Sequence, residues 1–223
     1  MTRTTNARVA GFTFLLYIAL GIGAMVLLGS AGNAEGIAAQ LAGYAQHASA
    51  VRAAAVLNLL TGFAALVLAV TLYAITRDQD PDVAMLALTC RVTEGVVGGL
   101  SIQRSLGLLW LATAAGASAA DTEATRTLGE FLVGQRWSMP IGATFFAVGS
   151  TLFSWLLLRG RMIPVALAWL GVLSSFLLAV GLPLQLAGVV PGSVIQFLWL
   201  PMAAFEIPLA LWLLIKGAAT PAR

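Results

Sequence analysis

The sequence predicts an all-α integral membrane protein, a bundle of six transmembrane helices with both termini in the cytoplasm. Apolar residues make up 60% of its 223 residues, charged residues make up only 9%, and the mean hydropathy is +0.93. Soluble domains carry roughly 25% charged residues, so lipid must be the main solvent of this chain. A helix needs about 20 apolar residues to cross the hydrocarbon layer. Residues 1–223 therefore form a single transmembrane domain, with no room for a soluble one.

Apolar runs follow one another along the chain, and charged, glycine or proline residues bound each run. The expected spans cover residues 9–29, 52–76, 82–116, 138–158, 163–187 and 194–216. The first run is longer than the roughly 7 to 15 apolar residues of a signal peptide, which favours a retained span. Cleavage after this run remains the alternative.

The segments between the spans are short. The polar stretch at 33–51 predicts a loop, and the sequence DTEATRTLGEFL within 117–137 predicts an amphipathic surface helix. RDQDPD at 77–82 predicts a tight acidic turn, with Pro81 in position to begin the next helix. The very short connection between the fourth and fifth spans predicts that they pack antiparallel.

The distribution of basic residues predicts the orientation. Seven lie on the side of the termini: Arg3, Arg8, Arg77, Arg159, Arg161, Lys216 and Arg223. Three lie on the other side: Arg52, Arg126 and Arg136. Because cytoplasmic loops carry the excess of Lys and Arg, both termini are expected in the cytoplasm. The expected location is the cell inner membrane or plasma membrane, with the lipid bilayer as partner.

Three ionisable residues inside the predicted spans are the candidate ligand- or proton-binding residues: Arg91, Glu94 and Glu206. A charge at mid-membrane costs about 3 kcal/mol on translocon scales, so such groups face the bundle interior and find partners. At about 1.5 Å per residue, all three lie near the bilayer centre. We expect the third and sixth spans to touch, with Arg91 bridging to Glu206. Glu94 would then be protonated or bind the cationic group of a ligand.

Four further residues are expected to support this site. Gly98 and Ser101 continue the polar, small-residue face of Arg91 and Glu94 at helical spacing. Asn58 is a polar group in the outer half of the second span. Pro208, close to Glu206, frees a backbone carbonyl one turn earlier, which is a recurrent device at mid-membrane binding sites. Packing or bundle shape alone would also explain each of them.

Several classes of function are disfavoured. With one cysteine, Cys90, and one histidine, His47, a haem-ligand pair or a zinc cluster is implausible, so no cofactor and no metal are expected. The basic residues are scattered singly, which argues against a nucleic-acid partner. No nucleophile elbow, HExxH or Walker loop occurs, so no catalytic residue is assigned.

Several segments resemble the bacterial integral-membrane family catalogued as domain of unknown function 4386. They are ARVAGFTFLLYIALGIGA at 7–24, CRVTEG at 90–95, LLLRGRMIPVALAWLGV at 156–172 and EIPLALWLLIKG at 206–217. The most specific matches are the Arg-x-x-Glu of Arg91 and Glu94 and the last-span residues Glu206, Trp212 and Lys216. Other members often carry a histidine in the fourth span, where this chain has Gly149. The resemblance implies the architecture and these residues of interest, but no reaction.

Three functions remain open from the sequence. The first is binding or transport of a small ionic or amphipathic molecule, a lipid or a proton at the Arg91, Glu94 and Glu206 cluster. The second is a structural or accessory subunit whose buried ion network only fixes helix packing. The third is a lipid-modifying membrane enzyme. A cavity that reaches Glu94 and Glu206 favours the first, whereas sealed packing around them favours the second.

Overall fold

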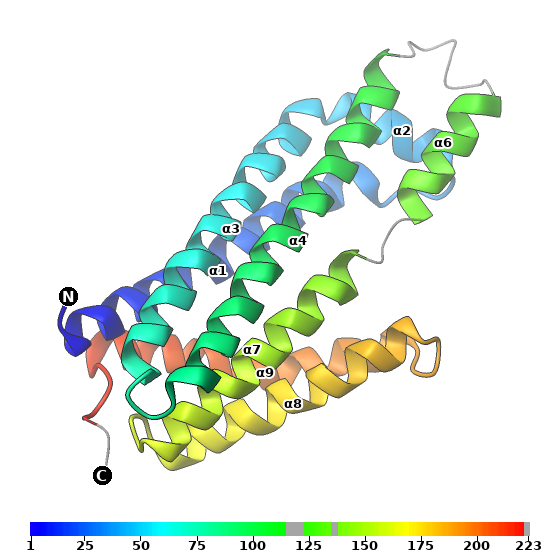
Figure 1. Ribbon diagram of the computed structural model, residues 1–223. Coiled ribbons are helices and arrows are strands. Elements are labelled where there is room, and N and C mark those ends of the chain that lie inside the picture. Colours follow the sequence, from blue (N-terminus) through cyan, green and yellow to red (C-terminus); the bar gives the residue numbers. More distant parts are fainter. Residues whose placement is uncertain (115–122, 135–137, 221–223) are drawn as a thin grey trace.

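The computed structural model describes residues 1–114, 123–134 and 138–220, and in these ranges the regular secondary structure is entirely helical (Figure 1). Six helices are long and apolar enough to cross a membrane. In chain order these spans are α1 (Arg3–Gly32), α3 (Ala48–Thr76), α4 (Pro81–Ala114), α7 (Ser138–Arg159), α8 (Val165–Leu186) and α9 (Gly192–Ile215). The predicted all-α fold with six membrane-spanning helices is confirmed.

Two shorter helices lie at the end of the bundle opposite the chain termini (Figure 1). The stretch predicted as a loop contains α2 (Ile37–Gln46). Its apolar residues Leu41 and Tyr44 are buried against α1, α3 and α4, which explains why it is helical. The amphipathic segment forms α6 (Glu123–Gly134), as predicted. The rest of that segment, at 117–122 and 135–137, lies outside the described residues.

The spans form a closed ring in chain order. Each span packs against the next one along the chain, and α9 returns to pack against α1. The short turn between α7 and α8 makes them antiparallel neighbours, as predicted (Figure 1). The third and sixth spans, α4 and α9, occupy opposite positions in the ring, which corrects the expectation that they pack together. Helices at opposite positions can still both present side chains to the interior.

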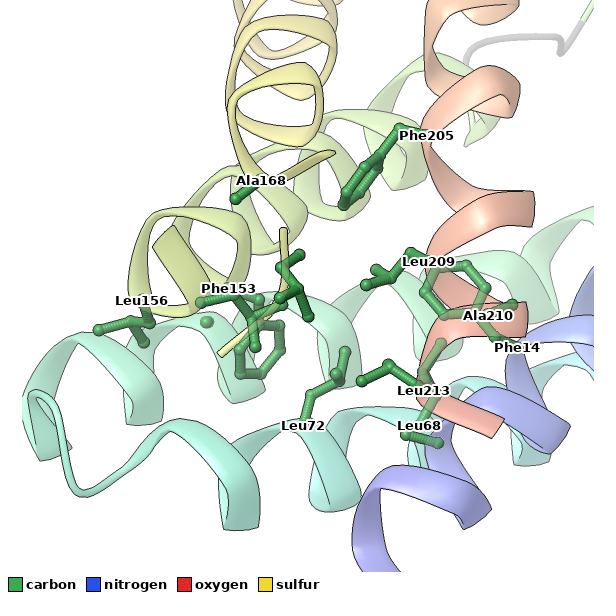
Figure 2. Packing of buried hydrophobic residues seen from close by; sticks show 14 of the residues in the cluster. Phe14, Leu68, Leu72, Phe153, Leu156, Ala168, Phe205, Leu209, Ala210 and Leu213 are labelled. Atoms are coloured by element: carbon green, nitrogen blue, oxygen red, sulfur yellow. The ribbon is translucent and has the colours of Figure 1, made fainter. Parts of the chain in front are cut away.

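The ring is packed most tightly in the half nearer the termini (Figure 2). Buried apolar side chains from all six spans contribute to this core, among them Phe14, Leu72, Phe153, Phe205 and Leu213. Lipid tails are as apolar as these side chains, so close packing and dispersion, rather than removal from water, hold such helices together. This half of the bundle therefore has little internal space.

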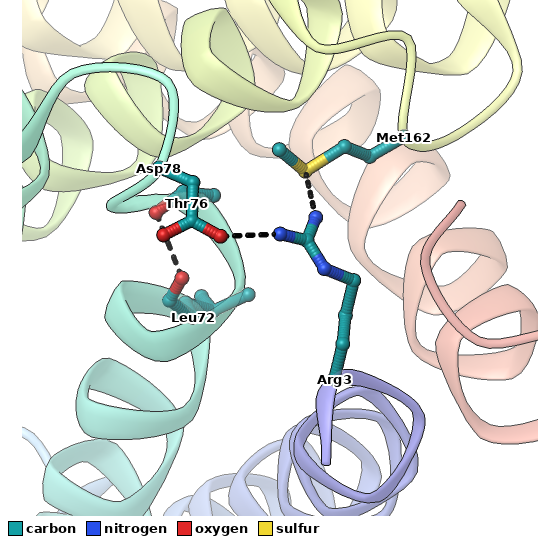
Figure 3. Close-up of polar contacts among 5 residues, drawn as sticks. All are labelled: Arg3, Leu72, Thr76, Asp78 and Met162. Atoms are coloured by element: carbon teal, nitrogen blue, oxygen red, sulfur yellow. Dashed lines mark hydrogen bonds and ion pairs between the residues drawn. The ribbon is translucent and has the colours of Figure 1, made fainter. Parts of the chain in front are cut away.

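Polar contacts join three segments at the end where the termini lie (Figure 3). Arg3 forms a 2.7 Å ion pair with Asp78 in the turn between α3 and α4, and its other Nη lies 3.8 Å from the Met162 sulfur. Met162 lies between α7 and α8, and its carbonyl accepts a hydrogen bond from the Ala219 amide. Arg3 thus connects the start of α1 to both turns.

Glycine allows α1 and α9 to approach closely. A Cβ at Gly11 would overlap the Leu214 amide nitrogen and the Ala210 carbonyl oxygen of α9. Because these atoms belong to backbone, they cannot move aside as a flexible side chain would. We expect Gly11→Ala to destabilise the protein by about 1–3 kcal/mol through overpacking, measured by unfolding in mixed detergent micelles.

The matched control is Gly21→Ala on the same helix, where an added Cβ meets no atom within 4 Å. This variant should keep the wild-type stability to within about 0.5 kcal/mol. Equal stability of the two variants would contradict the close α1–α9 contact.

Both termini lie at the same end of the bundle, and their cytoplasmic location is a prediction from the basic residues (Figure 1). Green fluorescent protein folds in the cytoplasm but not after export through the general secretory channel. Fused after Arg223, it is therefore expected to fluoresce, whereas an alkaline phosphatase fused there should be inactive. The reverse pair of results would invert the topology.

Candidate functional site

An ion pair within α4 lies at the centre of the candidate site. Arg91 Nη1 lies 2.8 Å from Glu94 Oε2, and both side chains are largely withdrawn from the surface, with relative exposures of 2% and 12%. Residues three apart on a helix are neighbours on its surface, so this pair needs no long-range folding to form. The geometry of the contact is not that of a hydrogen bond, and Arg91 Nε, Nη1 and Nη2 have no hydrogen-bond acceptor among the described residues.

Tyr17 of α1 completes a three-residue cluster with this pair. Its hydroxyl donates a 2.7 Å hydrogen bond to Glu94 Oε1, the carboxylate oxygen that does not contact Arg91. The Arg91 guanidinium carbon lies 5.5 Å from the centre of the Tyr17 ring and 4.7 Å from that of Phe146 on α7. Cation–π contacts of this kind are worth more when the cation is desolvated. The cluster of Tyr17, Arg91 and Glu94 therefore links α1, α4 and α7.

Gly149 of α7 provides the space for the Arg91 side chain. A Cβ at this position would lie 3.0 Å from Arg91 Cγ, 3.1 Å from Cδ and 3.2 Å from the Ala87 carbonyl oxygen. Any larger residue at position 149 would require Arg91 to move. The small residue and the buried arginine are therefore coupled by packing.

The predicted bridge between Arg91 and Glu206 is wrong. Among the described residues, the ion pair of Arg91 is with Glu94, and Glu206 forms no ion pair. Glu206 is nevertheless buried, its Oε1 has no hydrogen-bond donor among the described residues, and it interacts electrostatically with Arg91 and Glu94. Glu94 forms the ion pair with Arg91 because both residues are on α4, whereas Glu206 projects from α9 on the opposite side of the ring.

A partly open cavity of about 290 Å³, which we call the inner cavity, begins at Glu94. Its walls come from five spans, α1, α3, α4, α7 and α9. Most of the wall is apolar or aromatic, including Phe146 and Trp199, whose ring centres are 5.7 Å apart. Glu94 and Tyr17 supply the polar floor. The candidate residue Glu94 is therefore accessible from a cavity and not sealed by packing.

On the other side of Arg91 the bundle is nearly closed. A void of only about 20 Å³ lies there, lined by Arg91, Ser150, Ser154 and apolar residues such as Phe205. A space of this size holds about one water molecule. The inner cavity is therefore separated from the end with the termini by Arg91 and the packed core beneath it.

The predicted supporting residues divide into two groups. Asn58, Gly98 and Ser101 line the inner cavity. The Ser101 hydroxyl donates a 2.6 Å hydrogen bond to the Gly98 carbonyl, and the Asn58 side chain forms no hydrogen bond within the described ranges. Pro208 is exposed on the outside of α9 and does not line the inner cavity. This position fits the alternative that Pro208 only shapes α9.

Sequence reasoning missed the aromatic part of the site. Tyr17 and Trp199 were not among the predicted site residues, but both line the inner cavity. For Tyr17 the signal was present: it is a hydroxyl-bearing residue in mid-span, 14 residues from Arg3, at the depth of the charges. Phe146 carried no such signal, since it is one of many apolar residues in α7. Within the described ranges, no group of three or more His, Cys, Asp or Glu side chains is placed to hold a metal ion.

The family described as "Domain of unknown function (DUF4386)" matches residues 9–217, which is nearly the whole chain. The chain belongs to this family. A comparison with curated proteins gave no match, and neither did a comparison with solved structures. The matched range includes every residue of the Tyr17, Arg91 and Glu94 cluster and Glu206. For this DUF4386 chain, function must therefore be argued from the site itself.

Loss of the buried cation should be costly in this DUF4386 protein. Arg91→Met would leave Glu94 and Glu206 without their compensating charge, and breaking a buried pair typically costs about 3–5 kcal/mol. We expect a loss of stability of this size in detergent unfolding. The double variant Arg91→Met with Glu94→Leu should recover part of it, because one of the uncompensated carboxylates is then removed as well.

Arg126→Met provides the control. Arg126 pairs with Glu130 at 2.9 Å on the surface of α6, where both side chains are more than half exposed. Its loss should cost less than about 1 kcal/mol, as for other surface pairs. If Arg91→Met were as mild as this control, the buried pair would have no structural role.

Proposed function

We propose that this protein binds a small amphipathic molecule carrying a cationic group, with the cation at Glu94 and the apolar part in the inner cavity. One observation carries the proposal: among the described residues that line the inner cavity, only Glu94 bears a formal charge. Arg91 contacts the same carboxylate but lines the small void on the other side. A ligand in the inner cavity therefore meets the acid and not the arginine.

The charges of the site support a cationic ligand. Arg91 contributes one positive charge, and Glu94 and Glu206 contribute two negative charges when all three are ionised. The sum is one uncompensated negative charge in the middle of the bundle. Buried charges are stable when they are paired, so a bound cation or a proton would balance the set.

The shape and lining of the inner cavity support an organic cation over a bare ion. Its volume of about 290 Å³ is near the lower end of the roughly 300–1,000 Å³ typical of small-molecule sites. Phe146, Trp199 and Met139 form much of the wall, and aromatic rings favour quaternary or alkylated ammonium groups. A hydrated metal ion would gain little from such walls.

Binding is tested with benzyltrimethylammonium, a water-soluble cation with one aromatic ring. We expect the purified protein in maltoside detergent to bind it in isothermal titration, and Glu94→Gln to weaken binding at least about tenfold. Glutamine preserves the shape of the side chain and its contact with Tyr17 but removes the charge, and charged partners form the stronger contacts.

A second pair of variants separates loss of the site from loss of folding. An added Cβ meets no atom within 4 Å at either Gly98 or Gly99, but only Gly98 lines the inner cavity. Gly98→Leu should therefore block binding, and Gly99→Leu should leave it unchanged. The proposal fails if the Glu94 variant and both glycine variants bind the cation as the wild type does.

A structural role is the competing function, and the cross-helix contacts favour it. Tyr17, Arg91 and Phe146 join three spans, which is what a buried network that fixes helix packing requires. This function predicts that Glu94→Gln changes stability without changing the binding of any cation. The same titration, combined with unfolding measurements on that variant, distinguishes the two functions.

A further inference from the structure

A second cavity, which we call the outer cavity, adjoins the inner one. It has a volume of about 440 Å³ and is lined by residues of α1, α2, α3, α4 and α7. Asn58, Ser101 and Met139 line both cavities, so the two meet at these side chains. The outer cavity extends from there toward the end of the bundle where α2 lies. Apart from these three side chains, the described lining of the outer cavity is distinct from that of the inner cavity.

One face of α1 makes the outer cavity possible. Gly21, Gly29 and Gly32 lie on this face and line the cavity together with Met25 and Leu28. An added Cβ at Gly21 meets no atom within 4 Å. The absence of side chains at these positions leaves the space that the outer cavity occupies.

Arg104 gives the outer cavity its charge. Arg104 is partly buried and lines the outer cavity. Its Nε is buried without a hydrogen-bond acceptor among the described residues, and none of the ion pairs found there includes it. The described lining contains no Asp or Glu. Among the described residues, the only formal charge that lines this space is therefore positive.

The remaining polar groups of the outer cavity are suited to an anion. Asn33 and Asn58 carry amide hydrogens that can donate to oxygen, whereas the Ser101 hydroxyl already donates to the Gly98 carbonyl. A guanidinium presents parallel N–H groups that match two oxygens of a phosphate or a carboxylate. An unpaired, partly desolvated arginine gains most from such a partner.

We propose that the outer cavity is an anion-binding site in which Arg104 holds a phosphate or carboxylate group. The anion comes either from a lipid headgroup or from a soluble molecule, since both present the same oxygens. Arg104 is ten residues beyond Glu94 on α4, about 15 Å along the helix axis. The anion site at Arg104 and the cation site at Glu94 therefore follow one another along α4, and their charged residues have opposite signs.

The soluble arm of the test uses inorganic phosphate. The unfolding temperature is followed against phosphate concentration in maltoside detergent at constant ionic strength. Wild type should be stabilised, and Arg104→Gln should raise the apparent Kd for phosphate at least about tenfold, the effect of losing a charge-assisted contact. Arg52→Gln is the matched control, because Arg52 is exposed near the start of α3 and does not line the outer cavity.

The lipid arm uses vesicles of phosphatidylcholine with phosphatidylglycerol, from which the protein is extracted into maltoside. Native mass spectrometry then counts the phosphatidylglycerol molecules retained. Loss of this lipid in Arg104→Gln but not in Arg52→Gln identifies a headgroup site, and loss of phosphate binding alone identifies a soluble ligand. Gly21→Leu, which places a side chain in the outer cavity, should reduce whichever binding is found.

Two results would overturn the proposal. Equal weakening in Arg104→Gln and Arg52→Gln would mean that diffuse positive charge attracts the anion. Failure of wild type to bind either phosphate or phosphatidylglycerol would mean that the cavity holds no anion. Because benzyltrimethylammonium is measured separately at Glu94, neither result bears on the cation site.

Discussion

The structure depends on the cost of placing the Arg91 charge in the middle of a membrane. A guanidinium at that depth is tolerated only inside the bundle and beside an opposite charge. The remaining features around it meet this requirement. Glu94 supplies the charge from one turn further along α4, Tyr17 holds the carboxylate from α1, and Phe146 covers the cation from α7. The ring of spans closes around this group.

Small residues decide where the bundle is packed and where it is hollow. Gly11 brings the backbones of α1 and α9 together, and Gly149 admits the methylene groups of Arg91. Gly21 and Gly98 face open space instead. Glycine therefore allows close packing at Gly11 and Gly149 and leaves internal space at Gly21 and Gly98. As a result, the site is closed by packing on the side of the termini and is accessible from the cavities on the opposite side.

The span count could be predicted from the sequence because it follows from length and hydropathy. The partner of Arg91 was predicted wrongly, because two acids lie at its level and the bridge across the bundle was preferred to Glu94, which lies three residues away on the same helix. Nor could the sequence predict whether the Arg104 side chain faces lipid or a cavity, because this depends on the glycine face of α1, which belongs to a different helix.

The ring contact between α1 and α9 has a consequence for how the protein is made. Every other contact in the ring joins consecutive spans, which can associate as soon as the second of them emerges from the ribosome. The α1–α9 contact joins the first span to the last. Until α9 is synthesised, the ring is open between the first and the last span. During this time the charges of Arg91 and Glu94 can compensate each other, although α9 does not yet enclose their site. An i, i+3 pair on one helix is suited to that interval, since it needs no partner span to form.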